Sequence, residues 1–161
     1  APPQQDTLKV NVDGSSMGNE ETEDPLGNRG VAGIGGVLRN FEGTAIALFS
    51  KSIGIANSNA AEFMAIRVAL FVIDKRIRSH GPLDRKVIIE SDSSNAVAWA
   101  TSTVPVPWQL AQVFVTMMTL LDNIRVSATV EIIYANRESN GWADHLAKEG
   151  AHRRTPWCVW F

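Results

Sequence analysis

The stretch Lys9–Ser16 reads KVNVDGSS and predicts a β-strand that ends on a carboxylate. Polar and apolar residues alternate along it, which is typical of a strand with one buried face. Asp13 stands at the predicted end of the strand, and Gly14 breaks the pattern immediately afterwards. Because Asp-Gly is also a common turn dipeptide, Asp13 is either a turn residue or part of a site. The choice depends on whether other carboxylates reach the same place.

The composition of the chain is that of a soluble globular protein. Its 161 residues are 45% hydrophobic and 20% charged, and a single domain over residues 1–161 is the simplest division. The net charge of −2 lacks the basic excess of many nucleic-acid-binding proteins, but a carboxylate site is acidic until divalent cations bind. No apolar run approaches the roughly 20 residues of a membrane span, so no membrane partner is expected.

Two features bear on where the domain works. The single cysteine, Cys158, excludes a disulfide within the chain and favours a reducing, intracellular location, nuclear or cytoplasmic. The chain begins at Ala1 rather than at methionine, so we expect a domain excised from a longer polypeptide, and a monomer when it is isolated.

The hydrophobic pattern predicts the element order βββαβααβα, an α/β fold with a five-stranded mixed sheet. Three antiparallel strands are followed by two parallel ones, and helices pack on the sheet. Glycines within the second strand predict close backbone approach. The predicted strands cover residues 8–13, 31–39, 44–54, 86–92 and 127–136, and the predicted helices cover 57–77, 93–102, 107–124 and 140–153.

Two segments fall outside this pattern. Residues 16–29 form an insertion after the first strand, with a run of acidic side chains between Glu20 and Asp24. A solvated loop is expected there, and repulsion of phosphate or contact with a partner domain are the alternatives. The C-terminal tail, residues 152–161, is unusually aromatic and is expected to pack on the domain's own core, with docking to a partner as the alternative.

Four acidic residues stand where the predicted elements would bring them together. Asp13 and Asp92 end the first and fourth strands, whose carboxyl ends meet at one edge if the strands are parallel neighbours. Glu62 lies in the predicted first turn of the long helix, and Asp144 opens the last helix. Each also has an ordinary explanation: a turn for Asp13, a cap shared with Asn59 for Glu62, a helix N-cap for Asp92, and the helix dipole for Asp144.

Taken together, the four carboxylates predict a cation site. Clustered carboxylates repel one another and raise their own pKa values unless a positive charge lies among them. The chain has no histidine or cysteine set with transition-metal spacing, and oxygen ligands alone favour hard cations such as Mg²⁺ or Mn²⁺. Two such ions are the apparatus of phosphodiester hydrolysis. On this hypothesis Asp13 bridges the metals, and Gly14 lets a phosphate backbone pass close by.

Five segments of the chain resemble the ribonuclease H domain. They read VNVDGSS, AGIGGVLRN, NSNAAEFMAIRVAL, VIIESDSSNAV and NRESNGWADHLAKEGA, in this order, within residues 9–151. They are most similar to the plant version found in retrotransposon polyproteins and their domesticated relatives. The resemblance implies a ribonuclease H fold and an endonuclease that cuts the RNA strand of RNA/DNA hybrids, leaving 5′-phosphate and 3′-hydroxyl ends. It also implies two Mg²⁺ ions, with Mn²⁺ as a substitute, and a reverse transcriptase domain as a partner in the same polypeptide.

The resemblance also implies roles for individual residues. The family's metal-binding and catalytic carboxylates fall on Asp13, Glu62, Asp92 and Asp144. Asn59 occupies the position of an asparagine that contacts the nucleic acid in the minor groove. The backbone near Gly14 and Ser15 would approach RNA 2′-hydroxyls, which is how a protein distinguishes RNA from DNA at one site.

Three departures from the family pattern predict slower turnover or weaker binding. Tyr134 stands ten residues before the final aspartate, where the family usually has histidine, and a phenol cannot shuttle protons near neutral pH. Residues 93–124 contain no lysine, arginine or histidine, although the bacterial type carries a basic protrusion there. The third departure is the acidic insertion, residues 16–29. The cations that remain are Lys51, Arg67, Lys75, Arg76, Arg78, Lys86, Arg137 and Lys148, most of them expected on solvated surfaces.

The leading hypothesis is an active ribonuclease H domain that works within, or descends from, a reverse-transcribing element. The first alternative is a nucleic-acid-binding module with the same fold and weak or no cleavage. The second is a protein–protein scaffold that docks through the acidic insertion or through the tail Trp157–Phe161. Glu90 lies two residues before Asp92 on the same side of the strand and could be mistaken for the ligand.

Overall fold

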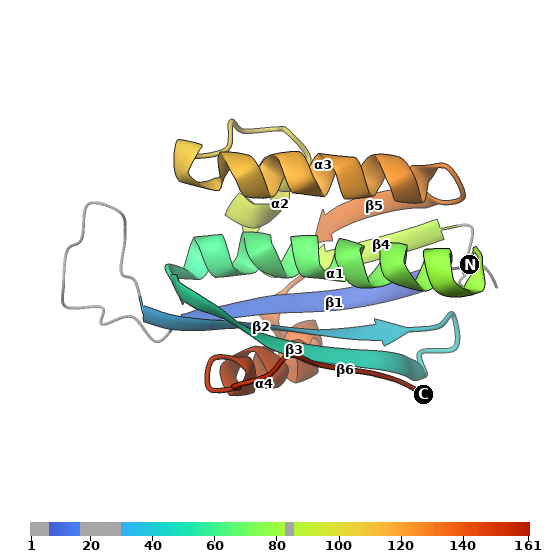
Figure 1. Cartoon of the computed structure of the whole chain (residues 1–161), viewed down its shortest axis with the longest axis horizontal. Helices are drawn as coiled ribbons and strands as arrows, with labels where there is room; N and C mark the ends of the chain where they lie inside the picture. The colour runs from blue at the N-terminus through green and yellow to red at the C-terminus, as the bar shows by residue number, and fades with distance from the viewer. Residues whose placement is uncertain (1–6, 17–29, 83–85) are drawn as a thin grey trace.

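The computed structural model describes residues 7–16, 30–82 and 86–161 and gives them the predicted order of strands and helices (Figure 1). The acidic insertion therefore lies largely outside the described residues. The strands are β1 (Thr7–Ser16), β2 (Gly30–Arg39), β3 (Ala45–Ala56), β4 (Lys86–Ser91), β5 (Thr129–Tyr134) and β6 (Trp157–Trp160). The helices are α1 (Ser58–His80), α2 (Ser94–Ala100), α3 (Ala111–Arg125) and α4 (Gly141–Gly150), with short 3₁₀ helices η1 (Trp108–Leu110) and η2 (Arg137–Asn140).

The strands form one mixed sheet in the order β5-β4-β1-β2-β3-β6. β1 runs parallel to β4 and β4 runs parallel to β5, whereas the pairs on the other side of β1 are antiparallel. The predicted α/β fold with a mixed sheet is confirmed. The parallel register pairs Val12 with Ser91, so the carboxyl end of β4 lies beside the middle of β1, next to Asp13.

The predicted number of five strands is wrong by one, because the C-terminal tail forms β6. Its residues pair antiparallel with β3, from Trp157 opposite Ser50 to Trp160 opposite Ala47. Without β6, the outer backbone groups of β3 would be unpaired at an open sheet edge. The expected packing of the tail on the domain is also seen, since Trp160 packs against the main hydrophobic core.

The two faces of the sheet carry different helices. Val10 of β1 is fully buried in the same core as Phe63 of α1, so α1 covers one face. On β2, Ile34 points into this core and its neighbour Gly35 faces α4, because side chains alternate along a strand. A Cβ atom at Gly35 would lie 2.5 Å from the backbone nitrogen of Ala147. The glycine-rich strand therefore allows α4 to pack closely on the opposite face.

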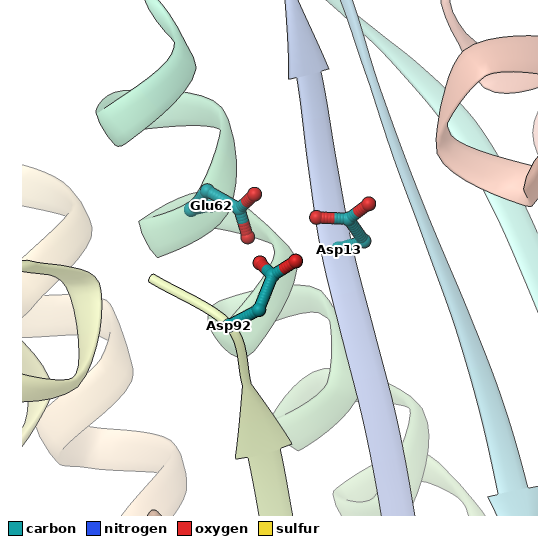
Figure 2. Close-up of side chains that lie close together, drawn as sticks. All are labelled: Asp13, Glu62 and Asp92. Atoms are coloured by element: carbon teal, nitrogen blue, oxygen red, sulfur yellow. The ribbon is translucent and has the colours of Figure 1, made fainter. Parts of the chain in front are cut away.

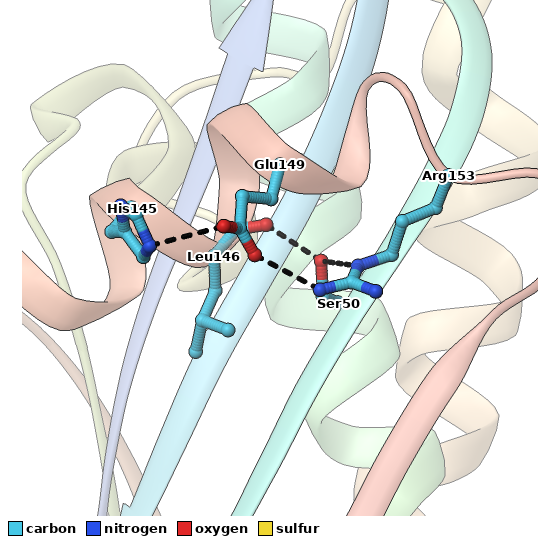
Figure 3. Close-up of polar contacts among 5 residues, drawn as sticks. All are labelled: Ser50, His145, Leu146, Glu149 and Arg153. Atoms are coloured by element: carbon cyan, nitrogen blue, oxygen red, sulfur yellow. Dashed lines mark hydrogen bonds and ion pairs between the residues drawn. The ribbon is translucent and has the colours of Figure 1, made fainter.

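Polar contacts fix α4 to β3 (Figure 3). Ser50 Oγ donates to the Leu146 carbonyl oxygen at 2.6 Å and accepts from Arg153 Nε at 2.8 Å. Glu149 then accepts from Arg153 Nη2 at 3.0 Å, and its other oxygen lies 3.2 Å from His145 Nε2. Ser50 is fully buried, so these contacts hold the helix that carries Asp144 at a fixed height on the sheet.

Among the described residues, no helix combines the length and the hydropathy that crossing a bilayer requires.

Candidate active site

Asp13 lies inside β1 rather than at its end. β1 continues to Ser16, and Asp13 pairs with Gly35 on β2. The predicted strand break at Gly14 is therefore wrong, because the glycine stays in the extended ladder, and the turn explanation for Asp13 is wrong with it. The Asp13 side chain is only 3% exposed. A buried carboxylate with no role in a turn needs partners that stabilise its charge.

Gly14 brings α1 into contact with β1 beside Asp13. A Cβ atom at Gly14 would overlap backbone atoms of Ala61 and Glu62, so only glycine allows the helix to come this close. Because the protein itself fills this space, the glycine is explained without a passing phosphate backbone. Gly14 and Ser15 are both partly exposed, and their contacts with RNA stay predictions.

The N-terminus of α1 is capped by Asn57 and not by Asn59 as predicted. Asn57 Oδ1 accepts from the backbone nitrogen of Ala60 at 2.8 Å, the usual reach of a capping side chain. Asn59 is exposed in the first turn, and its contact with nucleic acid stays a prediction. Glu62 lies beyond the first turn, contrary to the prediction, and does not complete a cap.

Asp92 follows β4 directly and is not a helix cap. Ser93 caps α2 instead, with its Oγ accepting from the backbone nitrogen of Ala96 at 3.1 Å. Arg137 Nε lies 3.8 Å from Asp92 Oδ2, but the Arg137 side chain is 88% exposed, so water screens this contact. The ordinary explanations for Asp13, Glu62 and Asp92 are thus all excluded by the local structure.

Three carboxylates converge at this edge of the sheet (Figure 2). One oxygen from each of Asp13, Glu62 and Asp92 lies within 4.8 Å of the other two. Glu62 Oε2 is buried and has no hydrogen-bond partner among the described residues. An unpartnered carboxylate oxygen aimed at two other carboxylates fits a hard divalent cation that binds through oxygen.

Burial and mutual repulsion raise the pKa values of this cluster. Burial is the largest cause that raises the pKa of Asp13 to about 7, and the charges of Asp92 and Asp144 add to it. Burial, the hydrogen bond with Asp13, and the charges of Asp13 and Asp92 raise the pKa of Glu62 to about 11. Without a cation, the cluster therefore keeps a proton at neutral pH. A divalent cation reverses this preference and favours the ionised carboxylates.

Asp144 lies beside Asp13 but outside the three-carboxylate group. It stands in the first turn of α4, where Lys148 Nζ lies 3.0 Å from its Oδ2. Burial raises the pKa of Asp144, but hydrogen bonds with Lys148 and Asp13, and the charges of Lys148 and Arg137, hold it below its usual value. The structure thus brings oxygens of Asp13, Glu62 and Asp92 close enough together to bind one cation. It leaves the fourth predicted carboxylate, Asp144, ionised beside them.

The structure also places Glu90 and Tyr134, two residues that the sequence analysis singled out. Glu90 is buried, with one oxygen 2.6 Å from Lys9 Nζ and the other accepting from Asn11 Nδ2 at 3.2 Å. Its charge is already compensated, so Glu90 is not a cluster member. Tyr134 ends β5 opposite Ser91 and its side chain is 57% exposed, which places a phenol at the same edge of the sheet.

Sequence reasoning missed Asn140. This side chain is 2% exposed and donates from Nδ2 to the Val12 carbonyl oxygen at 2.7 Å, which ties the start of α4 to β1 beside Asp13. The only signal for it was its place before Gly141 at the start of the helical pattern.

It also missed an aromatic hollow beside the start of α1. This hollow of about 620 Å³ lies between the start of α1 and the segment before α3, with Asn57, Met64, Trp99 and Trp108 in its wall. Trp108 is 81% exposed. The tryptophan itself was visible in the sequence, but its exposure and its place beside the start of α1 depend on how α1 and the segment before α3 pack.

Comparisons with known proteins agree with this geometry. The family model described as reverse transcriptase-like matches residues 24–150. Among curated protein sequences none matches the chain. Ribonuclease H1 from the archaeon Halobacterium salinarum NRC-1 is similar in structure, with 25% identity and a TM-score of 0.72 over 91% of this chain and 98% of that one.

Two other similar structures contain bound nucleic acid. LC11-ribonuclease H1, isolated from compost, was solved with an RNA/DNA hybrid and has 23% identity and a TM-score of 0.73 over 90% of this chain and 96% of that one. The foamy viral protease-reverse transcriptase, also in complex with RNA/DNA hybrid, has 17% identity and a TM-score of 0.67 over 92% of this chain and 20% of that one. These two likenesses concern the fold. The chain belongs to the reverse transcriptase-like family and is a ribonuclease H domain.

Proposed function

We propose that this domain hydrolyses the RNA strand of RNA/DNA hybrids with the help of two divalent cations, Mg²⁺ or Mn²⁺. The observation that carries the proposal is the convergence of Asp13, Glu62 and Asp92 around the unpartnered Oε2 of Glu62. Nothing in the cap, turn or ion-pair structure around these residues needs three buried acids. A divalent cation removes the free-energy cost of keeping them ionised.

Asp13, Glu62 and Asp92 would hold the cations, and Asp144 would join from the rim. Bound Mg²⁺ lowers the pKa of a coordinated water and neutralises charge that develops on the leaving oxygen. Asp13 interacts with Glu62, Asp92 and Asp144, so it is the residue that would be shared if two cations were held by these carboxylates. Hydrolysis on this pattern leaves a 5′-phosphate and a 3′-hydroxyl.

The chain's own residues would orient the hybrid. Asn59, which is exposed, and the partly exposed Gly14 and Ser15, which follow Asp13 directly, would contact the 2′-hydroxyls of the RNA strand. A reverse-transcribing element, in which the domain is joined to a reverse transcriptase in one intracellular polypeptide, would supply such a substrate.

A second candidate function is a hybrid-binding domain that cuts slowly or not at all. Two observations favour it: Tyr134 stands at the sheet edge where a histidine is expected, and Asp144 is held by Lys148 instead of joining the cluster. Replacing Tyr134 with histidine separates the candidates. If this replacement increases turnover about tenfold or more, the result supports slow cleavage limited by proton transfer. If neither the wild type nor the variant cleaves the hybrid, the result supports a domain that only binds.

The test is cleavage of a hybrid labelled on each strand, in Mg²⁺ and in Mn²⁺. The active enzyme should cut only the RNA strand, and Asp92→Asn should abolish the cut. Asp122→Asn is the matched control, because Asp122 is an exposed carboxylate on α3 away from the cluster. Folded protein that cuts with neither metal contradicts the nuclease proposal.

A further inference from the structure

A basic groove lies between α1 and the sheet edge formed by β3 and β6, and its volume is about 630 Å³. We call it the α1–β6 groove and define it by Arg67, Phe71, Lys75 and Arg76 of α1 and by Trp157 and Trp160 of β6. None of the four predicted carboxylates lines it. It is therefore separate from the candidate active site, although both use α1.

The charges in this groove are not compensated. Lys51 and His80 add to the cations above, and no aspartate or glutamate lines the groove. Arg67 and Lys75 form no ion pair with any residue in the described parts of the chain. Other cations do: Lys9 pairs with Glu90, Arg78 with Asp74 and Lys148 with Asp144. In a chain of net charge −2, four lysine and arginine side chains without acidic partners form a local positive field that attracts an anion.

Aromatic surface accompanies these cations. The Arg76 guanidinium lies 4.7 Å from the centroid of the Trp160 ring, and its Nε is buried without a hydrogen-bond partner among the described residues. Phe71 projects from α1 between Arg67 and Lys75 and is 55% exposed. Eight residues of helix separate Arg67 from Lys75, which is about 12 Å along the axis. The groove thus presents alternating cationic and aromatic groups over an extended length.

We propose that the α1–β6 groove binds single-stranded nucleic acid. Lysine and arginine side chains would contact successive phosphates, and the Phe71 ring would stack on a base. An acidic peptide would satisfy the cations but would leave this exposed aromatic surface without a planar partner, so the observations favour a nucleic-acid strand. Because the groove contains no predicted catalytic group, the proposal stands independently of hydrolysis.

Cys158 supplies a direct readout, because the chain's single cysteine lines this groove. Burial raises the pKa of its thiol and the charge of Lys75 opposes this rise, but the residue is exposed enough to react. The rate of modification by a disulfide reagent should fall at least threefold when a 15-nucleotide oligo-dT saturates the protein. Binding without protection of Cys158 would overturn the proposal, because the strand would then lie elsewhere.

Paired variants test the same site by affinity. Arg67→Gln with Lys75→Gln should weaken oligo-dT binding about tenfold or more at low salt and reduce the salt dependence by one to two phosphate contacts. Lys86→Gln with Arg125→Gln removes the same charge from outside the groove and should change affinity less than threefold. Equal weakening by both pairs, or equal protection of Cys158 by polyglutamate, contradicts a nucleic-acid site.

A failure of strand binding in the groove is distinguishable from a failure of the proposed hybrid cleavage. Asp92→Asn should abolish hybrid cleavage in Mg²⁺ and, when binding is measured in EDTA, leave oligo-dT binding and Cys158 protection unchanged. Loss of both oligo-dT binding and Cys158 protection in Asp92→Asn would mean that the strand binds at the carboxylates instead of the groove.

Discussion

The carboxylate cluster and the α1–β6 groove are opposite in charge and alike in one respect. The cluster gathers three carboxylates whose one cationic contact in the described parts of the chain is the exposed Arg137, and the groove gathers cations with no acid in its lining. Elsewhere in the described parts of the chain, some charged side chains pair at short range, as Lys9 and Glu90 do, and others stand singly on the surface, as Asp122 does. The contrast teaches that several uncompensated charges of one sign in one place, rather than single charges, are the observation behind both proposed ligand sites. The predictions below test this contrast, from the largest expected effect to the smallest.

The largest expected effect is loss of cleavage in Asp92→Asn. Groups that only orient a metal ligand typically contribute 10- to 100-fold, so removing a ligand should reduce turnover by about 100-fold or more. The variant keeps the side-chain shape, and its thermal unfolding should match that of the wild type within a few degrees. Calorimetric titration with Mg²⁺ should show weaker binding in parallel. Unchanged Mg²⁺ binding would remove Asp92 from the site.

Gly14→Ala should destabilise the domain by about 1–3 kcal/mol, because the added methyl group overlaps the backbone of α1. Urea denaturation measures this difference. Gly141→Ala is the matched control, since a Cβ atom there meets nothing within 4 Å and the backbone needs no positive φ. If the two variants are equally stable, then the close contact between α1 and β1 does not position Glu62.

Asp13→Asn should stabilise the metal-free protein at pH 8, on the order of 1–2 kcal/mol. Burial raises the pKa of Asp13 from 3.8 to about 7, so the folded state binds the proton more tightly than the unfolded state. Wild-type stability then falls as the pH rises from about 4 to about 7, and the deficit is complete above pH 7. The variant lacks this titration, and the two proteins should converge near pH 4.

Divalent cation should reverse this difference. Excess Mg²⁺ should stabilise the wild type at pH 8 and leave Asp13→Asn nearly unchanged, because only the intact cluster binds it. Denaturation curves measured in EDTA and in Mg²⁺ give the free energy of unfolding of each protein without and with the cation. A metal-free wild type that is more stable than the variant at pH 8 would show that the cluster is compensated within the protein.

The smallest effect is expected for Lys148→Met, which frees Asp144 from its ion pair. The pair is largely solvent-exposed, so the change in stability should stay below about 1 kcal/mol. The pKa of Asp144 should rise, because Lys148 is the main group that lowers it. Nuclear magnetic resonance titration of the carboxyl carbon reads this directly. A pKa that does not change would assign its lowering to the hydrogen bond with Asp13 and the charge of Arg137 instead.

Local patterns predicted most of the fold. The apolar stripe of α1 and the run Val87–Ile89 of β4 are signals that lie within single segments, and both elements form as expected. β6 was missed because four residues carry no periodicity of their own, and they become a strand only through β3, about 110 positions earlier in the chain. The cap of α1 was misassigned because Asn57 and Asn59 are chemically equal and only the backbone chooses between them.

The candidate site was predictable to the level of its residues but not of its charge state. Parallel pairing of β1 and β4 follows from their patterns, and it brings Asp13 near Asp92. The pairing of Asp144 with Lys148 and the orphan oxygen of Glu62 depend on side-chain directions that no spacing rule gives. The α1–β6 groove could not be predicted, since one of its walls is the unexpected strand β6.

The contacts of the Arg153 side chain couple the helix that carries Asp144 to the α1–β6 groove. Arg153 Nε donates to Ser50, its Nη2 contacts Glu149 of α4, and its guanidinium lies 5.0 Å from the Trp157 ring centroid in β6. One side chain therefore joins the helix that carries Asp144 to the wall of the groove. If a strand in the groove shifts Trp157, then the affinity for Mg²⁺ changes, and linkage requires Mg²⁺ to change the affinity for the strand by the same factor.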